Sequence, residues 1–231
     1  MLQIKKNLEL IRDRIDKAAR RVGRDPDEVR LVAVSKRKSA DQINEAFACG
    51  QTIFGENYLQ EASAKIDQLD SGINWHFIGH LQSNKASMAA NMFDVIQTVD
   101  RLKVARALDR SLAAGDRDVL PVLIQVNVGH EPQKSGVMPE DIGGLLREIR
   151  VLKNIKVRGL MVMPPFNSDP ELVRPYFRQT RELALSLRDQ GLLATEGEIE
   201  LSMGMSGDYE VAIEEGATLV RVGTALFGSR P

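Results

Sequence analysis

Hydrophobic and polar positions along the chain follow two patterns in turn, short continuous apolar runs and longer stretches with helical spacing. The first helical stretch covers residues 4–22, where apolar side chains recur every three or four positions and predict an amphipathic helix. The first apolar run is Leu31-Val32-Ala33-Val34-Ser35-Lys36, and it predicts a strand buried on both faces. Such strands are typical of a parallel sheet that is covered by helices.

The alternation of strand and helix continues to the end of the sequence. Further strands are predicted at residues 52–54, 75–78, 93–99, 119–128, 156–163, 198–202 and 219–222, and helices at 39–49, 58–69, 101–114, 139–151, 170–190 and 209–215, with another helix start at Ser83 and Asn84. Eight strand–helix pairs without a break in composition predict one domain over residues 1–231, a closed (β/α)8 TIM barrel with an extra N-terminal helix. An open, doubly wound sheet is the alternative fold.

Composition narrows the range of partners. Lysine and arginine number 31 and aspartate and glutamate 32, so the net charge of −1 creates no overall field that attracts nucleic acid or an anionic membrane. No apolar stretch is long enough to span a membrane, and Cys49 is the only cysteine, so an intrachain disulfide is excluded. We therefore expect a cytoplasmic protein with no nucleic-acid or membrane partner, in which a local site must bind any anion.

Lys36 ends the first predicted strand, at the edge of an α/β barrel where ligands usually bind. A partly desolvated lysine at this edge can lose its proton, attack an aldehyde and hold it as an imine. The alternative is that Lys36 only solvates the end of the strand. The residues around it do not decide between the two interpretations.

Two glycine-containing turns follow the last two predicted strands, at residues 201–208 and 221–228. The loops after strands seven and eight are a frequent phosphate site in such barrels. Exposed amide groups at helix starts, together with the hydroxyl groups of Ser206 and Thr224, can bind a dianion there. Helix capping is sufficient to explain either turn alone, but the presence of both favours a phosphate site.

Arg221 interrupts the last predicted strand, and alternation places it on the same face as Leu219 and Gly223, inside the barrel. A buried arginine needs an acceptor, either a glutamate in a salt bridge or the ring nitrogen of a ligand. A lysine amine, an anion site and this arginine together fit pyridoxal phosphate (PLP), which needs an imine-forming amine and a phosphate anchor.

Seven motifs in the sequence resemble those of the pyridoxal phosphate homeostasis proteins, a family whose barrel is similar to the amino-terminal domain of alanine racemase. They are Ala33-Val34-Ser35-Lys36, Phe54-Gly55-Glu56-Asn57-Tyr58, Trp75-His76-Phe77-Ile78-Gly79-His80-Leu81-Gln82-Ser83-Asn84-Lys85, Lys134-Ser135-Gly136, Arg158-Gly159-Leu160-Met161, Leu201-Ser202-Met203-Gly204-Met205-Ser206 and Val220-Arg221-Val222-Gly223-Thr224. They occur in the family's order across nearly the whole chain, and together they are highly specific.

The resemblance implies a role for each matching residue. It implies that Lys36 forms the imine (aldimine) with PLP, that Arg221 faces the pyridine nitrogen and that Asn57 lines the site; the implied phosphate ligands are Ser206, Gly207, Gly223 and Thr224. No role is assigned to His80. Lys85 and Lys134 either receive cofactor or are solvated loop lysines. No metal site and no catalytic residue is assigned.

The function that follows is that of a PLP-binding protein in intracellular PLP homeostasis. It would carry, buffer or hand over the cofactor and so influence amino- and keto-acid balance, with PLP-dependent apo-enzymes as recipients. Arginine can only donate a hydrogen bond, so the ring nitrogen opposite Arg221 stays unprotonated and the ring is a poorer electron sink. We therefore expect no turnover of its own.

The alternative from the enzyme class is a PLP-dependent amino-acid racemase of weak or narrow activity. Racemases of similar fold use a second base, a tyrosine supplied with an additional domain and a partner subunit. Because the sequence ends three residues after Gly228, we expect that domain to be absent and the protein to be a monomer. None of Tyr58, Tyr176 and Tyr209 matches the position of that base. A third interpretation, a barrel that binds no cofactor and serves as an interaction surface, does not account for the site residues above.

Overall fold

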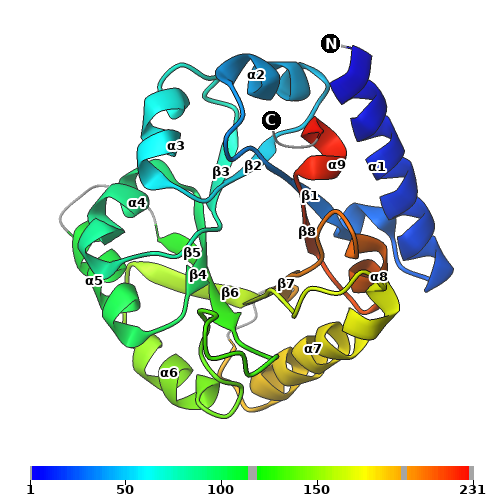
Figure 1. The fold of residues 1–231 in the computed structure, drawn as a ribbon. Coiled ribbons are helices and arrows are strands. Elements are labelled where there is room, and N and C mark those ends of the chain that lie inside the picture. The colour runs from blue at the N-terminus through cyan, green and yellow to red at the C-terminus, as the bar shows by residue number, and fades with distance from the viewer. Residues whose placement is uncertain (1, 114–118, 194–196, 229–231) are drawn as a thin grey trace.

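The computed structural model describes residues 2–113, 119–193 and 197–228, and its strands form the closed parallel barrel that the sequence predicts (Figure 1). The strands pair in chain order, and the last pairs with the first. They are β1 (Arg30–Val34), β2 (Ile53–Glu56), β3 (Asn74–Phe77), β4 (Val95–Val99), β5 (Leu120–Val126), β6 (Ile155–Val162), β7 (Glu200–Ser202) and β8 (Leu219–Val222). The doubly wound alternative is therefore wrong.

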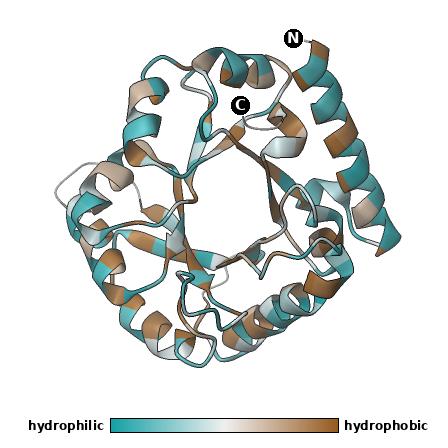
Figure 2. Cartoon of the chain, in the orientation of Figure 1, coloured by the Kyte–Doolittle hydropathy of each residue, from teal (hydrophilic) through white to brown (hydrophobic). Residues whose placement is uncertain are grey.

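Helices surround this barrel on the outside (Figure 1). They are α1 (Leu2–Arg21), α2 (Ala40–Ala48), α3 (Leu59–Ile66), α4 (Ala86–Met92), α5 (Leu102–Leu112), α6 (Ile142–Ile149), α7 (Arg174–Asp189), α8 (Tyr209–Glu214) and α9 (Thr224–Phe227), with short 3-10 helices η1 (Pro26–Glu28), η2 (Ser83–Lys85) and η3 (Pro170–Val173). Apolar residues concentrate on the strands and on the helix sides that face them (Figure 2). No helix within the described ranges is long and apolar enough to cross a membrane.

Two hydrophobic regions follow from the alternation of side chains along each strand. The larger one lies between the strands and the helices, and it includes Phe54, Phe77 and Leu8. The smaller one consists of Val32, Leu123, Met161 and Leu219, which come from four different strands. Because parallel strands point alternate residues inward, this second cluster fills part of the barrel interior.

The predicted helix at residues 170–190 is divided in the structure. Asp169 caps η3 by accepting a hydrogen bond from the N–H of Glu171, and α7 begins afterwards at Arg174. Proline is tolerated only in the first turn of a helix, so Pro170 and Pro175 each mark a separate start. The predicted helix end at Ala114 lies outside the described residues.

The barrel closes where the first and last elements meet. Val32 pairs with Arg221 and Ala33 with Val222 across β1 and β8. Outside this seam α1 packs beside α8 and α9 (Figure 1), and the side chain of Asn7 donates a 2.7 Å hydrogen bond to the carbonyl of Leu226. The closure brings the carboxyl ends of β1 and β8 side by side.

Candidate functional site

Lys36 lies in a turn that follows β1, at the carboxyl-terminal edge of the barrel. We call residues 35–38 the amine turn. Its first N–H, from Ser35, donates to the carbonyl of Gly55 on β2 (3.0 Å), and the N–H of Lys38 closes the turn on the carbonyl of Ser35 (3.0 Å). Lys36 itself is half-buried. Residue 36 therefore lies at the edge of the barrel where the sequence placed it.

The turns after β7 and β8, at residues 203–208 and 223–225, are the anion turns. In the described part of the chain, the backbone N–H groups of Ser206, Gly207, Gly223 and Thr224 donate to no protein acceptor. The N–H of Ala225 donates to Ser206 Oγ over 3.4 Å and links one turn to the other. Four unpaired donors on two adjacent turns fit an anion that carries several acceptor oxygens.

The amine turn and the anion turns are neighbours. A Cβ added at Gly223 would lie 3.3 Å from the Cβ of Val34, two residues before Lys36. The Nζ atom of Lys38 donates to the carbonyl of Phe227 over 3.3 Å, so the amine turn also contacts α9. The predicted neighbourhood of Lys36 and the turns after strands seven and eight is present, but Lys36 follows β1, which ends at Val34, and is not part of the strand.

Gly204 is a site residue that the sequence analysis missed. Its φ of +89° lies in the region that favours glycine, and a Cβ there would be 2.6 Å from the Cβ of Ala212 and 2.9 Å from the Cα of Tyr209. This glycine lets α8 pack directly against the first anion turn. Asp208 Oδ1 accepts a hydrogen bond from the N–H of Met205 (2.6 Å), and burial raises the pKa of Asp208 although that hydrogen bond opposes the shift.

Arg221 points into the barrel, with only 3% of its surface exposed. Its Nη1 donates to Ser202 Oγ (2.6 Å) and its Nη2 to the carbonyl of Val162 (2.8 Å). In the part of the chain that the structure describes, no carboxylate lies within ion-pair distance, so a buried salt bridge to a glutamate is the wrong alternative. Burial lowers the pKa of Arg221 to about 10, with Asp208 opposing the shift, and the guanidinium remains charged at neutral pH.

Two further residues extend this contact across the barrel. Ser202 Oγ donates to Gln97 Oε1 (2.6 Å), and Gln97 Nε2 lies 2.7 Å from Nδ1 of His76. Burial lowers the pKa of His76 to about 3, so the imidazole is neutral and its Nδ1 can accept the hydrogen bond from Gln97. We call Arg221, Ser202, Gln97 and His76 the interior polar chain. Polar residues within otherwise apolar strands, such as Gln97 and Ser202, were a signal in the sequence for polar groups inside the barrel, but not for which of them would bond to one another.

Asn57, His80 and Lys134 line a cavity of about 400 Å³ at the same end of the barrel, whereas Lys85 does not. Asn57 follows β2 and lines this cavity, and its Oδ1 is buried without a hydrogen bond from the described residues. His80 contacts Ser135 (3.0 Å), and Lys134 pairs with Glu131 and donates to the carbonyl of Pro164. Lys85 ends η2, and no role follows from its position.

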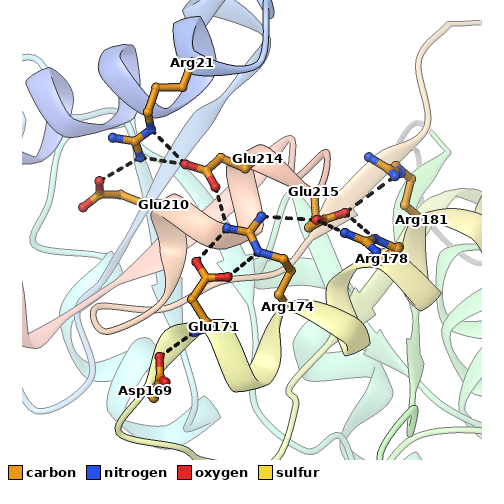
Figure 3. A network of polar contacts seen from close by, with 9 residues as sticks. All are labelled: Arg21, Asp169, Glu171, Arg174, Arg178, Arg181, Glu210, Glu214 and Glu215. Atoms are coloured by element: carbon orange, nitrogen blue, oxygen red, sulfur yellow. Dashed lines mark hydrogen bonds and ion pairs between the residues drawn. The ribbon is translucent and has the colours of Figure 1, made fainter.

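Outside the barrel, a network of ion pairs joins α8 to α1 and α7 (Figure 3). Glu214 on α8 contacts Arg21 of α1 at 2.8 Å and Arg174 of α7 at 2.7 Å. The next residue, Glu215, accepts from Arg174 at 3.2 Å and from Arg178 at 3.0 Å. Hydrogen bonds from these arginines lower the pKa of Glu215 even though burial, the largest single influence, opposes them. Since α8 follows the first anion turn, the network helps to fix that turn from outside.

Comparisons with known proteins show the family of this chain. Residues 6–231 match the family described as "Alanine racemase, N-terminal domain". The pyridoxal phosphate homeostasis protein of Pseudomonas aeruginosa PAO1 is 46% identical over 231 residues, which cover 100% of this chain and 97% of that protein, and the one of Escherichia coli K12 is 43% identical over 235 residues, covering 100% and 98%.

A solved structure of PipY from Synechococcus elongatus PCC7942 with PLP bound has a TM-score of 0.84 and 39% identity, and it covers 98% of this chain and 100% of that one. Alanine racemase of Corynebacterium glutamicum, at 19% identity and a TM-score of 0.69 over 97% of this chain and 61% of that one, shares the fold. The resemblance inferred from seven motifs is confirmed, and this chain belongs to the pyridoxal phosphate homeostasis proteins, within the alanine racemase N-terminal domain family.

Proposed function

We propose that this protein binds PLP at the carboxyl-terminal edge of its barrel, with Lys36 bonded to the aldehyde carbon and the phosphate on the anion turns. We further propose that it acts in PLP homeostasis by holding the cofactor and handing it to PLP-dependent apo-enzymes, as a cytoplasmic monomer and without turnover of its own. Its relatives carry the name pyridoxal phosphate homeostasis protein, and the structure of PipY holds PLP.

One observation carries the proposal: four backbone N–H groups that have no acceptor among the described residues lie on turns that adjoin the turn of Lys36. Backbone donors at the ends of strands seven and eight of a barrel suit a phosphate, and their positions are fixed by the fold. A single small molecule with a phosphate at one end and an aldehyde near the other could contact both turns. PLP has this shape.

Different residues of the site bind different parts of PLP. Ser206, Gly207, Gly223 and Thr224 hold the phosphate through their N–H groups, and Lys36 supplies the amine that forms a C=N bond as one water molecule leaves. Bound PLP supplies the aldehyde and an electron-withdrawing ring.

Arg221 determines whether bound PLP can support catalysis in addition to binding. It reaches the barrel interior as a charged donor and would present a hydrogen bond, but no proton, to the pyridine nitrogen. An unprotonated ring nitrogen weakens electron withdrawal from a bound amino acid, which favours storage over turnover. Asn57, whose Oδ1 lacks a partner in the described residues, lines the same end of the barrel and can accept a hydrogen bond there.

The proposal is tested by adding PLP to the purified protein, reducing with borohydride and locating the modified peptide by mass spectrometry. We expect a visible absorption band and modification at Lys36, with both lost in Lys36→Ala and kept in the control Lys85→Ala. A protein that stays colourless, or that carries the label on another lysine, would contradict the proposal.

Two further measurements address storage and transfer. Incubation with single amino-acid enantiomers in deuterated water should give no steady exchange at Cα, whereas exchange with inversion would indicate a racemase. Transfer of bound PLP to an apo-enzyme is measured in the presence of a scavenger that traps any free PLP. Direct hand-over should persist under these conditions, because the cofactor is never released into solution. If the scavenger abolishes transfer, direct hand-over is wrong.

A further inference from the structure

The amine turn is held from outside the barrel by a buried lysine. Lys65 lies on α3 and is only 7% exposed. Its Nζ donates to the carbonyl of Ser35 (2.9 Å) and to the carbonyl of Lys38 (3.3 Å). One ammonium group therefore connects the first and last residues of the four-residue turn that carries Lys36.

Two glutamates hold Lys65 in this position. Nζ lies 2.6 Å from Oε1 of Glu56, at the end of β2, and 2.9 Å from Oε1 of Glu61, one turn earlier on α3. Glu56 is fully buried, and the same Oε1 accepts a 2.6 Å hydrogen bond from Ser35 Oγ. The carboxylate thus contacts both the lysine and the first residue of the amine turn.

Glu61 reaches the turn at a second point. Its Oε1 accepts a hydrogen bond from the backbone N–H of Arg37. Arg37 has a φ of +59°, in the left-handed region that residues other than glycine seldom adopt. The contact stabilises this unfavourable conformation directly after Lys36, and such conformations persist only where surrounding groups hold them.

A buried ion pair is a poor way to gain stability alone. The free energy needed to remove two charges from water is about as large as their electrostatic attraction inside the protein. Apolar residues of similar size often give an equally stable or more stable protein. The contacts of this cluster suggest a role in geometry and not in stability. Lys65, Glu56 and Glu61 each bond to a backbone or hydroxyl group of the same turn, residues 35–38.

We propose that Lys65, Glu56 and Glu61 form a positioning cluster that fixes the backbone of the amine turn, so that the Lys36 amine is directed toward the anion turns before any ligand arrives. The inference rests on the proposed PLP site. None of the three residues is expected to contact the cofactor. Rigid preorganisation of a functional side chain by surrounding contacts is a general requirement for precise binding.

The test uses the full chain and a variant that avoids leaving one buried charge alone. Lys65→Met combined with Glu56→Gln removes both charges of the pair, while Lys65→Arg retains a cation with several donors. The matched control is Lys17→Met combined with Asp13→Asn, which removes an exposed ion pair of 2.7 Å on α1. If the buried double variant does not fold, Glu61→Ala, at a partly exposed position, removes the acceptor of the Arg37 N–H.

Two readouts separate the cluster from the PLP proposal. In the PLP-free protein, amide hydrogen exchange at Arg37 should be roughly ten-fold faster in the double variant or in Glu61→Ala than in the unmodified protein, and Lys65→Arg should exchange more slowly than the double variant. In the PLP titration, the dissociation constant should rise roughly ten-fold, equivalent to about 1.4 kcal/mol, with no change in the α1 control.

The outcomes are distinguishable. Unchanged exchange at Arg37 together with unchanged PLP affinity in the folded variants would overturn the positioning role. An unmodified protein that binds no PLP would contradict the proposed function, whereas the exchange measurement would still decide whether the cluster orders the turn.

Discussion

The two sides of the candidate site are built in different ways. The amine turn is held by charged side chains, since Lys65 and Glu61 bind its backbone from α3. The anion turns instead offer backbone N–H groups, and their geometry depends on close backbone packing at Gly204 and on α8 behind it. The amine turn is therefore positioned by side-chain hydrogen bonds and ion pairs, and the anion turns are positioned by backbone packing.

This difference predicts where substitutions act. On the amine side, the loss of a carboxylate or an ammonium group should change the order of the turn while the barrel persists. On the anion side, most side chains can be replaced without losing a donor, but an added Cβ at a close contact displaces the whole turn. Arg221, beneath the anion turns, also depends on a side chain for its position, because its Nη1 donates to Ser202 Oγ, which in turn donates to Gln97.

The largest effect is expected for Gly204→Ala. The substitution forces a side chain into a left-handed conformation and toward the Cβ of Ala212, only 2.6 Å away, so the free energy of unfolding should fall by about 3 kcal/mol. Urea denaturation measures this change. Gly207→Ala is the matched control, because nothing lies within 4 Å of its added Cβ. Equal losses at the two glycines would contradict the close-packing argument.

A smaller loss is expected for Ser202→Ala. It leaves Arg221 Nη1 and Gln97 Oε1 buried without their shared partner, which should lower the free energy of unfolding by about 2 kcal/mol. The control is Ser111→Ala, which removes only a hydroxyl that donates to the carbonyl of Ala107 within α5. A Ser202 variant no less stable than this control would show that the interior polar chain does not hold Arg221.

The smallest effect near neutral pH is expected from His76. Its folded-state pKa of about 3 lies below its ordinary value of 6.5, because burial disfavours the charged form. The unfolded state binds the extra proton between these values, so this contribution to stability is complete above pH 6.5 and is lost as the pH falls toward 3. The loss should approach about 1.4 kcal/mol per pH unit.

Denaturation at pH 7 and at pH 5.5 measures that slope in His76→Gln and in the exposed control His130→Gln. The His76 variant should lose less stability on acidification than the unmodified protein, and the His130 variant should follow the unmodified protein. Identical slopes in all three would mean that the buried imidazole does not titrate on unfolding.

Local patterns in the sequence predicted the barrel order, the position of Lys36 and the inward direction of Arg221. They succeeded because apolar periodicity, turn glycines and strand alternation are properties of neighbouring residues. The acceptor of Arg221 was not predictable in this way, since Ser202 becomes its partner only when β7 and β8 lie together. Lys65 was missed for the same reason: spaced four residues after Glu61, it has the pattern of an ordinary exposed helix pair, yet it bonds to a turn 27 to 30 residues away.

The most direct test of the site is a crystal structure of the protein with PLP. We predict continuous electron density from Lys36 Nζ to the cofactor, with phosphate oxygens within about 3.2 Å of the backbone nitrogens of Ser206, Gly207, Gly223 and Thr224. A phosphate bound away from these turns, or a cofactor at the turns with no bond to Lys36, would contradict the account.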